Sequence, residues 1–153
     1  MGHNNESGYG DTFCGCTALK TVTASNKLEY IGCKGFCNCT NLEDITGLSG
    51  TIGLHRDAFS GCSKLKNSNF TNVEFVLNHR NAFYNCKLLT SILLSTSCID
   101  IPQSTFEECS GLTTVTGLSN ATTIGERCFL NCGALTNVDI DWSKITTIYS
   151  GGF

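Results

Sequence analysis

A chain of 153 residues that is 41% hydrophobic and only 15% charged has enough apolar material for one folded domain, so intrinsic disorder is not expected. The net charge is −3, and the Lys and Arg residues are scattered, with Lys64 and Lys66 as the closest pair. This pattern matches neither a nucleic-acid-binding surface nor a polybasic membrane patch. No stretch approaches the roughly 18 apolar residues that cross a bilayer. We therefore expect no nucleic-acid binding and no membrane insertion.

The N-terminal segment, residues 1–12, begins with polar residues and lacks the basic end and apolar run of a signal peptide. We interpret it as a short non-repeat segment or a partial repeat. From residue 13 onward, a phenylalanine recurs every 23 or 24 residues, which defines one repeat domain over 13–153. The units start at Phe13, Phe36, Phe59, Phe83, Phe106 and Phe129, and a seventh unit is cut off at Phe153.

Within each unit the predicted elements follow in the same order. The spacing of three in Phe-x-x-Cys-x-x-Leu predicts a turn or a short 3-10 or helical segment. The next residues, such as Thr21-Val22-Thr23, alternate in polarity and predict a short strand. Gly and Asn then turn the chain, and an aliphatic residue leads back to the next Phe. The repeat cysteines are Cys16, Cys39, Cys62, Cys86, Cys109 and Cys132, each three residues after a Phe.

A unit of 23 residues cannot bury its own apolar face, so it must lie against the next copy. This requirement predicts a solenoid in which columns of Phe, Cys, Leu and Ile or Val face the interior. Each well-buried large apolar side chain contributes about 1.5–3 kcal/mol before the entropy of ordering is subtracted. Strands of successive coils should then form a parallel ladder, with few long helices.

The combined pattern resembles a known repeat family. Ile-Gly-x-x-x-Phe, as in Ile31 to Phe36 and Ile124 to Phe129, together with Phe-x-x-Cys-x-x-Leu, is similar to the BspA-type (Treponema pallidum-type) leucine-rich repeat. The resemblance implies a curved leucine-rich-repeat solenoid with a parallel β-sheet on its concave face. It also implies a cell-surface or secreted protein that adheres to host proteins or other cells, without catalysis by the repeat. Because no signal peptide is visible, the location stays open.

The same resemblance places a candidate binding face on the concave sheet. Its residues are the eighth and tenth after each Phe, which flank the buried aliphatic residue of the strand. Such a polar face, with one apolar residue, could bind an extended partner, although Thr and Asn on a sheet can also satisfy one another. The candidate residues are Thr21, Thr23, Asp44, Thr46, Asn67, Asn69, Ser91, Leu93, Thr114, Thr116, Asn137 and Asp139.

Eleven cysteines raise the question of metal or redox chemistry. No pair has the Cys-x-x-Cys spacing of common zinc sites, so we interpret the six repeat cysteines, and Cys98, as small apolar core residues. Three cysteines outside the repeat position, Cys33, Cys37 and Cys128, could be exposed thiols with a local metal or redox role.

The three histidines do not all occupy one repeat position. His55 and His79 each precede a Phe by four residues, so they could lie on adjacent coils, but exposed loop histidines are the simpler interpretation. His3 lies in the N-terminal segment. We find no phosphate-binding loop, nucleophile elbow or His-Glu-x-x-His motif. The sequence predicts no catalytic, cofactor or metal site.

The leading functional hypothesis is a non-enzymatic interaction module that binds a protein or glycan through the repeat surface. One alternative is a structural spacer within a longer solenoid, and a weaker one is a thiol- or metal-handling protein. Solenoids normally need polar caps. Repeats without such caps could also associate end to end with a second copy.

Overall fold

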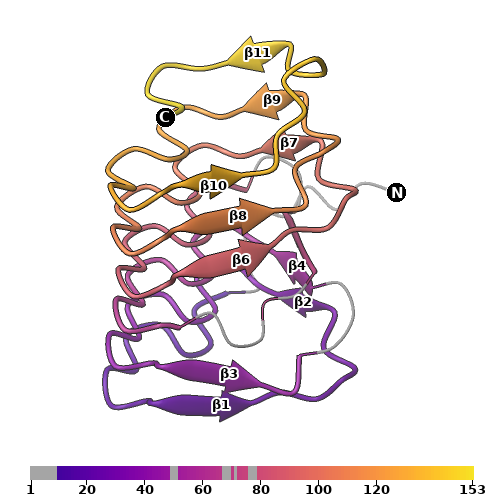
Figure 1. Ribbon diagram of the computed structural model, residues 1–153. Helices are drawn as coiled ribbons and strands as arrows, with labels where there is room; N and C mark the ends of the chain where they lie inside the picture. The colour runs from indigo at the N-terminus through magenta and orange to yellow at the C-terminus, as the bar shows by residue number, and fades with distance from the viewer. Residues whose placement is uncertain (1–9, 49–51, 67–69, 71, 76–78) are drawn as a thin grey trace.

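The computed structural model describes residues 10–48, 52–66, 70, 72–75 and 79–153. The chain winds into a stack of coils, and two columns of short strands lie on different sides of the stack (Figure 1). All strand pairs between successive coils are parallel, as the sequence predicts. Over the described residues, the regular secondary structure consists of strands alone, and none of it is a helix that could cross a membrane.

The first ladder is the predicted one, and it contains the alternating Thr and Val segments. A second ladder runs through the aliphatic return segments, which the sequence did not show as strands. The first ladder comprises β1 (Thr21–Thr23), β3 (Asp44–Thr46), β6 (Ser91–Leu93), β8 (Thr114–Thr116) and β10 (Asn137–Val138). The second comprises β2 (Tyr30–Ile31), β4 (Ile52–Leu54), β5 (Val73–Phe75), β7 (Asp100–Ile101), β9 (Thr123–Ile124) and β11 (Thr147–Ile148).

Among the described residues, the strand pairing divides each ladder into two sheets. The first consists of the sheets β1-β3 and β10-β8-β6, and the second of β2-β4-β5 and β11-β9-β7. In each sheet the register pairs equivalent positions of neighbouring coils, such as Val22 with Ile45 and Ile92 with Val115. The aliphatic side chains therefore stack in columns, and Ile45, Ile92 and Val115 are buried.

The phenylalanines form the most regular column of the interior. Successive rings, from Phe13 to Phe153, stack nearly parallel with centroids 5.1 to 5.7 Å apart and interplanar angles of at most 18°. Phe59, Phe83 and Phe106 are completely buried. Offset aromatic stacking adds about 0.5–1.5 kcal/mol per pair beyond simple burial, so the column stabilises the contact between every pair of coils.

The Phe-x-x-Cys segment is a turn, and neither a 3-10 nor an α-helix. In each unit the Cys amide donates a hydrogen bond to the Phe carbonyl three residues earlier, as from Cys86 to Phe83 at 3.1 Å. The residue before each Cys has a positive φ, which a type II turn requires and a helix cannot contain. These residues are Gly15, Asn38, Gly61, Asn85, Glu108 and Asn131, so Gly and Asn, which adopt positive φ most easily, dominate.

The repeat cysteines are core residues, with one exception. Five of the six are buried, and each thiol of these five donates a hydrogen bond to the Phe carbonyl of the preceding coil, at 2.9 to 3.2 Å. Each such thiol therefore adds a polar contact between coils as well as apolar volume. Cys16 is exposed, so the core prediction is wrong for this residue, which belongs to the first coil. Cys98 is buried, as predicted.

Two of the three cysteines for which the sequence left open an exposed thiol are buried. Cys128 has no exposed surface, and burial raises its pKa well above the ordinary value. Burial, with a contribution from the neighbouring Cys14 thiol, raises the pKa of Cys37 to about 11. Both lie in the turns around the Phe column, where the stacked coils exclude water. The prediction of reactive thiols is therefore wrong for Cys37 and Cys128, and only the half-buried Cys33 remains accessible among the three.

Candidate functional site

The candidate binding face lies along the first ladder. Of its described residues, none is buried: Thr21, Thr23, Leu93, Asn137 and Asp139 are exposed, and the others are half-buried. The remaining two, Asn67 and Asn69, lie outside the described residues. The strands therefore present these side chains to solvent, and their role in binding stays a prediction.

Several contacts on this face are internal to the sheet. The Thr46 hydroxyl lies 3.3 Å from the Thr23 hydroxyl on the adjacent strand, within hydrogen-bond distance. The Asp139 carboxylate accepts hydrogen bonds from the Gly117 and Leu118 amides at 2.9 and 2.8 Å. Part of this polar face thus stabilises the coil-to-coil contacts, which reduces what it offers to a partner.

A groove of about 900 Å³ lies on the other side of the stack, along the second ladder. It runs past β5 and β7 and reaches residues of six successive coils. Groove residues combine apolar side chains with charges of both signs, and none of them belonged to the predicted binding face. The lining residues are Cys33, Arg56, Glu74, Phe75, His79, Arg80, Ser97, Cys98, Ile99, Asp100, Ile101, Pro102, Gln103, Thr123, Gly125, Glu126 and Tyr149.

Two features of the groove favour a ligand. Ile99 and Tyr149 expose 54% and 56% of their surface, which gives the groove apolar contact area that water covers poorly. The Nε atom of Arg56 is buried without a hydrogen-bond acceptor, and the nearest carboxylate oxygen, on Asp57, lies 3.6 Å away. A buried donor without a partner is unfavourable by about 1–3 kcal/mol, so an acceptor atom from a bound molecule would stabilise this site.

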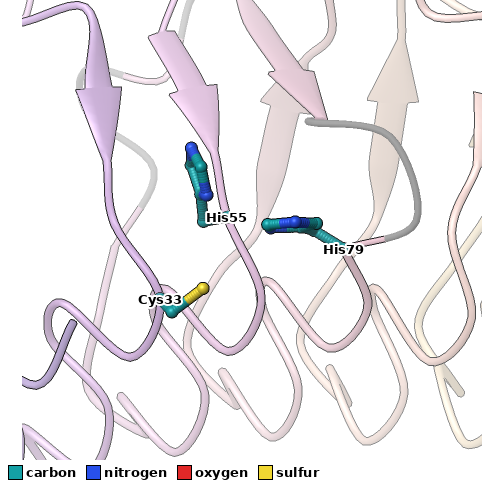
Figure 2. Close-up of side chains that lie close together, drawn as sticks. All are labelled: Cys33, His55 and His79. Carbon is teal, nitrogen blue, oxygen red and sulfur yellow. The ribbon is translucent and has the colours of Figure 1, made fainter. Parts of the chain in front are cut away.

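Three side chains with metal-binding chemistry meet at one end of the groove (Figure 2). Cys33, His55 and His79 come from three successive coils, and one ligand atom of each lies within 4.8 Å of the other two. The two imidazole rings pack edge to face with centroids 4.6 Å apart. The structure confirms that the two histidines lie on adjacent coils, and all three residues are half-buried rather than exposed.

The surroundings favour neutral imidazole rings. Burial, together with the neighbouring His79, lowers the pKa of His55 below its ordinary value. His79 accepts a hydrogen bond at Nδ1 from the backbone amide of Arg56, at 3.0 Å. Neutral imidazole is the form that binds a metal ion, so the pair is chemically suited to act as ligands.

Sequence reasoning missed both the groove and this cluster. The groove lies beside β5 and β7, and strands of two or three residues are too short to show an alternating pattern. In the cluster, His55 and His79 stand four residues before a Phe and Cys33 stands three before one, so the three do not share a repeat position. The available signal was the equal offset of the two histidines, which placed them on adjacent coils.

Comparison with protein families settles the repeat class. The model of the BspA type leucine rich repeat region matches six copies, over residues 9–79 and 78–153. The chain belongs to the BspA-type leucine-rich repeat family. This membership confirms the resemblance seen in the sequence, and the stacked parallel strands confirm the predicted repeat solenoid.

Solved structures of other leucine-rich proteins share the fold of this chain. A leucine rich cell surface protein from Faecalibacterium prausnitzii A2-165 superposes with a TM-score of 0.65 at 24% identity, over 80% of this chain and 39% of that one. A leucine rich repeat protein of T. pallidum gives a TM-score of 0.56 at 21% identity, over 83% of this chain and 70% of that one. These similarities establish the fold. The chain thus spans well under half of the F. prausnitzii protein, and no curated protein is significantly similar to it in sequence.

Proposed function

We propose that this BspA-type chain is a non-enzymatic interaction module that binds another macromolecule, and that the groove along the second ladder is its principal contact surface. The groove of about 900 Å³ carries this proposal, because it combines exposed apolar side chains with charges of both signs. Binding sites that hold extended chains are concave and mainly apolar, with a few oriented polar groups.

The lining favours a protein segment over a neutral glycan. Arg56 and Arg80 lie in the same groove as Glu74, Asp100 and Glu126. A polypeptide can offer carboxylates, amines and apolar side chains together, whereas a neutral glycan has no charged group to pair with these residues. The Nε–H group of Arg56, which has no acceptor among the described residues, could donate a hydrogen bond to a backbone carbonyl or a carboxylate of such a segment. The polar first ladder remains the alternative surface, for a protein or for a glycan.

A matched pair of substitutions separates the two surfaces. Leu93 on the first ladder and Ile99 in the groove are both exposed aliphatic side chains of the same coil, with 42% and 54% of their surface accessible. Peptides that bind the wild-type protein can be selected from a displayed random library. These peptides should bind the Ile99→Glu variant at least about tenfold more weakly than the wild type, because a carboxylate would replace an apolar contact. Their affinity for Leu93→Glu should be unchanged.

The reverse result would place binding on the first ladder and contradict the groove proposal. A neutral-glycan array, probed with the same two variants, supplies the second arm of the experiment. Glycan binding that disappears with Leu93→Glu and survives Ile99→Glu would also contradict it. Circular dichroism of both variants verifies that neither substitution unfolds the solenoid.

A further inference from the structure

The solenoid stacks Cys33, His55 and His79 on one side, from three separate coils. His55 directly follows β4, Cys33 lies two residues after β2, and His79 comes four residues after β5. The backbone bonds hold this register, since the His55 amide donates to the Ile31 carbonyl at 3.0 Å and the Lys34 amide donates to the Arg56 carbonyl at 2.8 Å. Figure 2 shows the Cys33 sulfur and the His79 ring directed toward the His55 side chain. The fold therefore brings them together without any local sequence motif.

The separations suit a small metal ion. When three atoms all lie within 4.8 Å of one another, some point lies within about 2.8 Å of all of them. Zinc takes Cys sulfur at about 2.3 Å and His nitrogen at about 2.0–2.1 Å. Each ligand atom therefore needs to move by less than about 1 Å, which a small rotation of a half-buried side chain can supply.

The ligand types select the class of metal. One thiolate and two imidazoles suit a borderline-soft transition ion, whereas Mg²⁺ and Ca²⁺ require oxygen ligands. We propose that Cys33, His55 and His79 bind one Zn²⁺ ion. On binding, the Cys33 thiol releases its proton to solvent and its sulfur bonds to the metal as a thiolate, while both imidazoles bind as neutral rings. The fourth tetrahedral position then takes a water molecule or a donor group of a bound partner.

The hydrogen bond between Arg56 and His79 competes with the metal. The Arg56 amide donates to Nδ1 of His79. A metal ion at Nδ1 displaces the Arg56 amide. A metal ion at Nε2 requires the ring proton to move to Nδ1, which then no longer accepts. The hydrogen bond from the Arg56 amide is therefore lost in either case. Loss of one such bond lowers the affinity by about tenfold. We therefore expect a Kd of about 1 µM, weaker than that of a four-ligand structural zinc site.

The decisive experiment is metal titration of the full chain, reduced and stripped with a chelator. We expect one Zn²⁺ per chain, release of about one proton at neutral pH, and a cobalt-loaded form with a thiolate-to-metal charge-transfer band. X-ray absorption should give one sulfur and two nitrogen ligands. Cys33→Ser and His55→Gln should each raise the Kd by more than about 100-fold, since loss of a direct ligand exceeds the 10–100-fold effect of an outer contact.

The matched control is Cys14→Ser, because Cys14 is also a thiol outside the repeat position and is more exposed. This variant should bind zinc as the wild type does. If Cys14→Ser lost the metal, or if Cys33→Ser kept it, the assignment would be overturned. Metal protection of the wild-type chain gives a readout that needs no variant: Zn²⁺ should protect Cys33 from alkylation by iodoacetamide and leave Cys14 reactive. Equal protection of both thiols, or of neither, would contradict the site.

Discussion

The first and fourth coils carry the same Phe-x-x-Cys-x-x-Leu motif in two different environments. In the fourth coil, Phe83 and Cys86 are completely buried. In the first, Phe13 exposes 43% of its surface and Cys16 is exposed as well. The motif itself therefore does not decide burial. Burial depends on the coils stacked on either side, as expected for a fold whose stability is a sum of coil-to-coil contacts.

The largest expected effect is the difference between Phe83→Ala and Phe13→Ala in the free energy of unfolding that each substitution removes. The Phe83 ring stacks between Phe59 and Phe106, with centroids 5.5 and 5.7 Å away, and meets Phe70 edge to face. Phe83→Ala should lower the free energy of unfolding by about 3–5 kcal/mol, because it leaves a cavity in a filled core. Phe13→Ala should lower it by about 1 kcal/mol, since much of that ring is already in water. Urea unfolding followed by circular dichroism measures both values, and equal losses would contradict the comparison.

The cysteine column should show a smaller difference of the same kind. The Cys86 thiol donates to the Phe59 carbonyl at 3.2 Å. Cys86→Ala removes both this bond and the sulfur volume, so the free energy of unfolding should fall by about 2 kcal/mol. Cys16→Ala, at an exposed thiol, should change it by less than about 0.5 kcal/mol.

A third variant tests whether the hydrogen bond matters at this position. Cys86→Ser keeps a donor that can reach the Phe59 carbonyl, whereas a purely apolar site would reject the hydroxyl group. If the thiol acts as a donor, Cys86→Ser should be at least as stable as Cys86→Ala in the same urea assay. If Cys86→Ser were clearly the less stable of the two, the column would be held by apolar packing alone.

The interior could be predicted from the sequence because its residues repeat. The Phe, Cys and Leu positions recur at fixed offsets, and the first ladder follows from its alternating Thr and Val. The error at Cys16 came from applying a rule for interior coils to the first coil. Turn geometry was only partly visible, since Gly15, Asn38 and Asn85 point to a positive φ after each Phe, whereas Glu108 at the same position does not.

The surface sites could not be predicted in the same way, because they depend on departures from the repeat. The groove lies beside β5 and β7. Three of its charged residues, Arg56, Arg80 and Glu126, share the position three residues before a Phe, but the sign of the charge there changes from coil to coil. Similarly, the cluster of Cys33, His55 and His79 joins unequal offsets from three units. Individual residues, rather than the repeated ones, make up the surface of a repeat protein. Predicting which of them lie side by side requires the register between coils, which the structure supplies.

The stability of the fold at high pH tests one buried cysteine, Cys132 of the sixth unit. Burial raises the pKa of Cys132 from its ordinary value of 9.0 to about 11. Between these two values the unfolded chain loses the thiol proton while the folded chain keeps it, so ionisation stabilises the unfolded state. The contribution of Cys132 to stability is complete below pH 9 and declines as the pH rises toward 11.

Other groups of the chain also titrate between pH 9 and 11, but the Cys132→Ala substitution removes only the ionisation of the Cys132 thiol. The free energy of unfolding of the wild type should therefore fall more steeply between pH 9 and 11 than that of Cys132→Ala, in urea titrations at fixed pH. Parallel slopes for wild type and Cys132→Ala would show that the Cys132 thiol ionises alike in both states.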